Sequence, residues 1–88
     1  MAEDKKHNCH VCGLYSEDLP WGKDGRSPTY IISDCCGVEF GNEDYTVEST
    51  KKYREEWIKK GAPWFISKAK PLNWSLERQL MNIPNKFK

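Results

Sequence analysis

The sequence lacks a long apolar run. No stretch approaches the ~18–20 apolar residues that a helix needs to span a bilayer, so we expect no membrane span. Residues 1–8 are charged and contain no apolar stretch, so we expect no secretory signal and a cytoplasmic protein. The sequence has no internal repeats, and its 88 residues leave no room for a second domain. We therefore predict a single domain over residues 1–88, with flexible ends at residues 1–7 and 85–88.

The sequence is also poor in residues that enzymes use for acid–base chemistry. Its two histidines, His7 and His10, both lie beside the first cysteine pair. No motif places a nucleophile next to a base or a carboxylate as a general base. A zinc ion with three sulfurs and a water would formally resemble a catalytic centre. On balance, however, we expect a protein without enzymatic activity.

The net charge of +1 argues against a protein dedicated to nucleic-acid binding. The charge is nevertheless uneven along the chain. Residues 1–44 hold four Lys/Arg and nine Asp/Glu, a net charge of −5, whereas residues 45–88 hold ten and four, a net charge of +6. Such a charge separation can orient a binding partner. A solvated, lysine-rich helix face explains the basic half equally well.

Four cysteines form two pairs, Cys9 with Cys12 and Cys35 with Cys36, and a glycine follows each pair directly. Disulfides are disfavoured in the reducing cytosol, so two thiol pairs at this separation favour a tetrahedral zinc site. The glycine relieves a tight turn that aims both sulfurs at one metal. We predict that all four cysteines are the ligands of a structural Zn²⁺, because small domains often depend on such a site for stability.

The second cysteine pair is irregular. A regular pair would have a cysteine three residues before Cys36, where Ser33 stands. The fourth ligand is therefore open: Cys35, Asp34, or a histidine near the first pair, His10 or His7. A site with only three ligands, a metal-free variant of a zinc fold and a redox-active thiol pair are the alternatives.

The fold class that we predict is α+β. Residues 15–28 are rich in glycine and proline and indicate a loop. Residues 30–33 and 38–40 are rich in β-forming residues and flank the second cysteine pair, which is typical of half a zinc ribbon. Residues 9–44 should thus form a β head with two cysteine knuckles. This head should pack against a helical part at residues 45–84.

That helical part should contain one longer and one shorter helix. Thr46 is a suitable N-cap for the first helix, and Gly61 and Pro63 predict its end. Apolar residues at helical spacing follow Thr46 and give this helix one face that should pack on the head. The second helix should lie near residues 75–82 and stop before Pro84.

The chain resembles the small bacterial cysteine-rich proteins known for a Cys-Pro-Cys-Cys motif. The resemblance covers most of residues 9–84 and rests on residues 9–13, 35–40, the Pro-Trp-Gly of 20–22, residues 53–57, and Trp74, Leu76, Gln79 and Leu80. Where the motif has its first cysteine and its proline, this chain has Ser33 and Asp34. The resemblance implies a zinc-ribbon or rubredoxin-like head, with metal-type cysteines at Cys9, Cys12 and Cys36. It also implies a partner-binding or toxin-neutralising protein.

Together these features predict a non-catalytic protein-interaction module with a structural cysteine site, resembling an immunity protein and binding an unidentified protein partner. The alternative is a nucleic-acid-binding zinc ribbon that uses the basic half at residues 45–88. Its affinity would fall steeply with salt.

Overall fold

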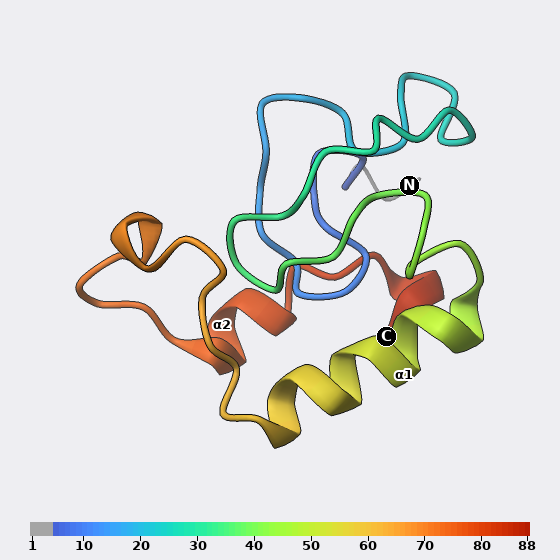
Figure 1. The fold of residues 1–88 in the computed structure, drawn as a ribbon. Helices are drawn as coiled ribbons and strands as arrows, with labels where there is room; N and C mark the ends of the chain where they lie inside the picture. The colour runs from blue at the N-terminus through green and yellow to red at the C-terminus, as the bar shows by residue number, and fades with distance from the viewer. Residues whose placement is uncertain (1–4) are drawn as a thin grey trace.

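Over the described residues the regular elements are four helices, and the loops around them make up most of this part of the chain (Figure 1). The computed structural model describes residues 5–88. Along the chain the elements are the α-helix α1 (Val47–Lys59), the 3₁₀-helix η1 (Ser67–Ala69), the α-helix α2 (Leu76–Leu80) and the 3₁₀-helix η2 (Asn85–Phe87). Of the end predicted to be flexible, residues 1–7, the first four residues lie outside the described part of the chain.

Helix α1 begins and ends where the sequence predicts. The Thr46 hydroxyl accepts a hydrogen bond from the Ser49 N–H, and the Ser49 hydroxyl accepts one from the Thr46 N–H, so both groups form a capping box. After the helix, Gly61 has a φ of 96°, a left-handed conformation that ends helices. Thr50 and Trp57 are buried on the face toward the loops.

Helix α2 is shorter than the predicted segment. The Ser75 hydroxyl accepts a hydrogen bond from the Arg78 N–H and caps the helix. Only Leu76–Leu80 is α-helical, and turns continue the chain to Ile83, which is buried. The prediction of a second, short helix at this place is confirmed.

The predicted β head is wrong, and with it the α+β class. Residues 5–88 contain no β-strand, only two isolated antiparallel bridges, Asn8 with Tyr15 and Ile32 with Glu39. The reason is local to the second bridge. Tyr30 has a φ of 61°, which is incompatible with an extended strand. The Phe40 N–H donates to the Ile31 carbonyl, and the Phe40 carbonyl accepts from the Tyr30 N–H. Tyr30 and Ile31 therefore both pair with the single residue Phe40, and the antiparallel pairing ends there.

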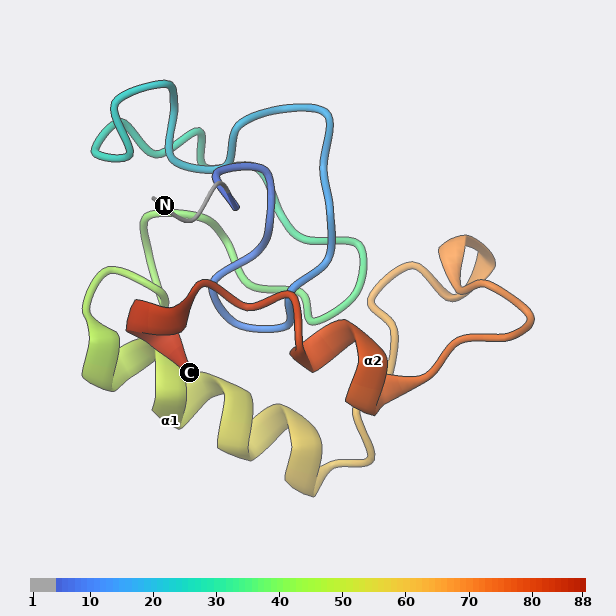
Figure 2. The ribbon, with the colours of Figure 1, turned by 180° about the vertical axis from the view of Figure 1, so that it is seen from behind.

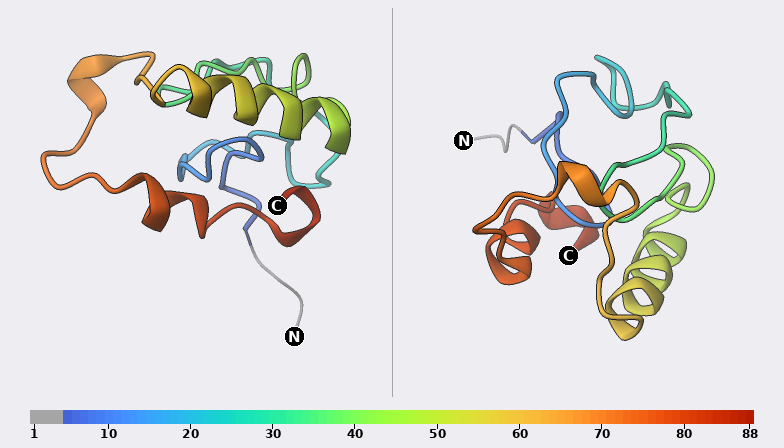
Figure 3. Two further views of the ribbon diagram at one scale, coloured as in Figure 1. Left: turned by 90° about the horizontal axis from the view of Figure 1, so that it is seen from below. Right: turned by 60° about the vertical axis from the view of Figure 1, so that its left-hand side comes forward.

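The two bridges each end a tight turn that carries cysteines. We call residues 8–15 the first cysteine loop and residues 32–39 the second cysteine loop. Figure 3 shows the first cysteine loop in blue between α1 and the C-terminal segment. From behind, η2 lies against α1 (Figure 2). The two cysteine loops therefore supply most of the buried core, and α1 and the C-terminal segment pack against them.

Arg54 on α1 connects this helix to the first cysteine loop and to η2. Its Nε donates to the Val11 carbonyl at 2.6 Å, and its Nη2 donates to the His10 carbonyl at 2.8 Å and to the Phe87 carbonyl. One half-buried guanidinium on α1 thus binds the first cysteine loop and η2 together. Bonds from a charged donor are about twice as strong as neutral ones.

The loop at residues 15–28 is anchored by a buried carboxylate. Asp44 is fully buried, and its side chain accepts hydrogen bonds from Trp21 Nε1 at 3.0 Å and from the Gly41 N–H at 2.6 Å. Burial raises the pKa of Asp44, and these two donors partly offset the shift. The loop is therefore tied to the turn that leads into α1.

Among the described residues, no helix combines the length and apolar character needed to cross a bilayer.

We expect Arg54→Ala to lower the free energy of unfolding by about 2–4 kcal/mol, because it leaves three carbonyl acceptors unpaired. Arg78→Ala, at an exposed position on α2, is the matched control and should change it by less than about 0.5 kcal/mol. Urea unfolding of the two variants in one buffer measures the difference. Equal stabilities would show that Arg54 does not join the parts.

Candidate metal centre

The first cysteine loop is built by two backbone hydrogen bonds. The Cys9 N–H donates to the Leu14 carbonyl and the Gly13 N–H donates to the Cys9 carbonyl, both at 2.9 Å. Gly13 has a φ of 83°, as the tight turn requires. A Cβ there would also collide with the Gln79 carbonyl of α2, so glycine lets α2 approach the loop.

The second cysteine loop repeats this pattern at corresponding positions. The Ser33 N–H donates to the Val38 carbonyl at 2.8 Å, and the Gly37 N–H donates to the Ser33 carbonyl at 3.1 Å. Gly37 has a φ of 79°. Ser33 therefore holds the place that Cys9 holds in the first cysteine loop, and Cys36 holds the place of Cys12.

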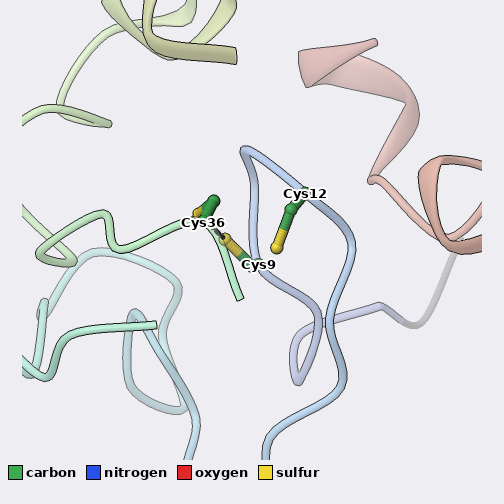
Figure 4. A group of neighbouring side chains, drawn as sticks. All are labelled: Cys9, Cys12 and Cys36. Atoms are coloured by element: carbon green, nitrogen blue, oxygen red, sulfur yellow. Dashed lines mark hydrogen bonds between the residues drawn. The ribbon is translucent and has the colours of Figure 1, made fainter. Parts of the chain in front are cut away.

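Three cysteines meet between the two loops, and we call Cys9, Cys12 and Cys36 the thiol cluster. Their sulfurs all lie within 4.8 Å of one another, and the Cys9 and Cys36 sulfurs are 3.7 Å apart (Figure 4). With Zn–S bonds of about 2.3 Å, a tetrahedral site places its sulfurs about 3.8 Å apart. The three buried sulfurs are thus close enough to hold a metal ion.

Cys35 lies beside the thiol cluster: its sulfur interacts with Cys12 but is not within 4.8 Å of all three cluster sulfurs. It is buried, and its sulfur accepts a hydrogen bond from Gln79 Nε2 at 3.1 Å. The Gln79 Oε1 in turn accepts one from Trp74 Nε1 at 2.7 Å. Of the four predicted ligands the structure gathers three, and ligation by the full set stays a prediction.

The other candidate ligands lie elsewhere. Asp34 is exposed, and His7 Nδ1 hydrogen-bonds the Ser16 carbonyl. His10 stacks on the Phe87 ring at a centroid distance of 3.9 Å, and burial together with the nearby Lys86 lowers its pKa to about 4. Within residues 5–88 no histidine, aspartate or glutamate completes a four-ligand group with the thiol cluster.

The thiols of the cluster differ in the direction of their pKa shifts. Burial raises the pKa of Cys9 and of Cys36, and interactions with the neighbouring sulfurs add to the shift of Cys9. Burial also acts against ionisation of Cys12, but hydrogen bonds from Cys35, Cys36 and Cys9 outweigh it and hold its pKa well below the usual range. The surrounding sulfurs therefore favour the thiolate form at Cys12 more than at Cys9 or Cys36.

Sequence reasoning missed one residue of this centre, Ser33. It is buried, its Oγ lies 3.8 Å from the Cys12 sulfur, and it accepts a hydrogen bond from the Cys35 N–H at 3.3 Å. The signal was present in the sequence, because Cys-x-x-Cys-Gly at residues 9–13 corresponds to Ser-x-x-Cys-Gly at residues 33–37.

No protein-family model, no curated protein and no solved structure matches the chain. The resemblance to the Cys-Pro-Cys-Cys proteins therefore stays a prediction.

We expect Zn²⁺ binding to release protons, because burial raises the pKa of Cys9 and Cys36 and these thiols must lose their protons to bind a metal. The metal-free state then binds more protons than the zinc-bound state, so the apparent zinc affinity should rise with pH. Calorimetric titration in buffers of different protonation enthalpy measures the number of protons released.

The control is Ser67→Ala, at an exposed serine outside the cluster, which should release the same number of protons as the unmodified chain. An affinity that is constant or falls as pH rises would contradict the assignment of the three thiols as ligands.

Proposed function

We propose that this protein is a non-catalytic interaction module whose fold is stabilised by a structural zinc ion. The observation that carries the proposal is the thiol cluster: two loops that are distant in sequence bring three buried sulfurs to one point. A fold with little regular secondary structure gains much from such a link. Structural zinc binding contributes about 10 kcal/mol or more in small domains.

Zinc suits this set of donors. Thiolates are soft ligands, and a tetrahedral arrangement of mostly sulfur donors is typical of structural zinc. The separation of the Cys9 and Cys36 sulfurs agrees with the edge of such a tetrahedron. Burial of all three cysteines supports a structural role over a catalytic one, because a substrate would need access to the metal.

The thiol cluster lies next to a surface that suits a protein partner. A pocket of about 280 Å³ adjoins Cys36, and its lining includes four aromatic residues, Tyr53, Trp57, Trp64 and Phe65, beside Glu56 and Lys60. Phe65 is 57% exposed at this pocket. Aromatic residues in and around a pocket are typical of sites that contribute most to protein binding.

The second cysteine loop positions this pocket. The Phe65 N–H donates to the Cys35 carbonyl and the Ile66 N–H donates to the Asp34 carbonyl, both at 2.9 Å. The Tyr53 hydroxyl donates to the Cys36 carbonyl at 3.2 Å. A metal that fixes this loop therefore also fixes the pocket's walls.

The pocket also indicates the chemistry of its occupant. Four of the residues that line it are aromatic, Tyr53, Trp57, Trp64 and Phe65. An apolar side chain that enters the pocket would pack against these rings and fill the volume. We therefore propose a protein partner that inserts an apolar residue here.

We expect Phe65→Ala to weaken binding of that partner by at least about tenfold. Leu72→Ala, at a fully exposed position outside the pocket, is the matched control and should bind like the unmodified protein. Affinity capture from the cells that make the protein, quantified by mass spectrometry, identifies a partner retained by the control and lost by Phe65→Ala. Capture of the same proteins in equal amounts by all three forms would contradict the proposed surface.

A further inference from the structure

We infer that the Ser33 hydroxyl is the fourth donor of the metal centre, so that the protein holds its metal through three thiolates and one serine oxygen. This inference rests on the proposed metal site and adds its fourth ligand. It implies a metal that is bound less tightly, and exchanges more readily, than in a site of four cysteines.

The first support is the backbone. The two cysteine loops share their hydrogen-bond pattern and their positive-φ glycines, Gly13 and Gly37. In this correspondence Cys12 matches Cys36 and Cys9 matches Ser33. Three of the four equivalent positions carry sulfurs of the thiol cluster, and the fourth carries a hydroxyl on the same framework.

The second support is distance. The Ser33 Oγ lies 3.8 Å from the Cys12 sulfur. With Zn–S bonds of about 2.3 Å and a Zn–O bond of about 2.1 Å, a tetrahedral site places sulfur and oxygen about 3.6 Å apart. The observed separation from Cys12 therefore differs from the tetrahedral value by only a few tenths of an ångström.

The third support is burial. Ser33 is only 4% exposed, and the three cysteines are 6% exposed or less. Bulk water has little access to the centre, so a donor from the chain itself is favoured. The Cys35 sulfur interacts with Cys12 and Gln79 but does not lie within 4.8 Å of all three cluster sulfurs, and within residues 5–88 no histidine or carboxylate completes the group.

The Ser33 hydroxyl oxygen also has a lone pair with which to bind a metal. A serine oxygen has two lone pairs, and one of them accepts the hydrogen bond from the Cys35 N–H. The second lone pair is free for a metal, and the hydroxyl proton can be retained. Ser33 thus adds a neutral ligand.

Charge favours this neutral ligand. Zinc with three thiolates and a hydroxyl carries one negative charge, whereas zinc with four thiolates carries two. The guanidinium of Arg54 binds the carbonyls of His10 and Val11 in the first cysteine loop and supplies one positive charge. A buried centre is less costly when its charge is balanced.

The test compares the unmodified chain with Ser33→Cys and Ser33→Ala, each reduced and loaded with one equivalent of Zn²⁺. X-ray absorption at the zinc edge should give three sulfurs and one oxygen for the unmodified chain and four sulfurs for Ser33→Cys. Competition with a zinc indicator should give an affinity at least about tenfold higher for Ser33→Cys and at least about tenfold lower for Ser33→Ala. Ser67→Cys and Ser67→Ala, at an exposed serine, are the matched controls and should change neither quantity.

Each outcome bears on one claim. Four sulfurs in the unmodified chain, reduced to three in Cys35→Ala, would assign the fourth position to Cys35 and overturn the inference. An unchanged affinity in Ser33→Ala would assign the oxygen to water and overturn it as well. A chain that binds no zinc at all would instead overturn the proposed metal site, and the affinity of Ser33→Cys would then show whether one added sulfur creates it.

Discussion

The close approach of three sulfurs between the two cysteine loops is the contact on which the rest of the structure depends. The two loops contain no strand that could pair them with each other. Each loop has one β-bridge, which joins two residues of the same loop. Three thiols in a core act as small hydrophobes, and burial raises the pKa of Cys9 and Cys36, which opposes their ionisation in the absence of a cation. A bound metal stabilises the thiolates and converts a loose contact into a fixed link.

The helices and the pocket depend on these loops. Arg54 of α1 binds backbone carbonyls of the first cysteine loop, and Tyr53, one residue earlier, binds a carbonyl of the second. The segment after α1 continues this pattern, because Phe65 also bonds the second loop. A helix of 13 residues thus holds both loops, and the metal centre and the aromatic pocket form one connected unit.

Local signals in the sequence predicted the features that depend on neighbouring residues. Thr46 and Gly61 mark the two ends of α1 through interactions within a few residues. The glycines after each cysteine pair likewise predicted tight turns. The absence of the predicted β head could not be foreseen in the same way, because Tyr30 adopts a left-handed backbone conformation that β propensity does not reveal. The direction of Cys35 depends on Gln79, 44 residues later, and is likewise a tertiary effect. Ser33 was visible as a missing cysteine, but its contact with Cys12 required the fold.

The measurement that tests the account most directly is the metal content of protein purified without added zinc, together with its thermal unfolding before and after treatment with a chelator. The account predicts about one equivalent of zinc per chain and loss of cooperative unfolding, or a fall of several tens of degrees, once the metal is removed. Protein that contains no zinc, and that unfolds at the same temperature with and without chelator or added Zn²⁺, would contradict it.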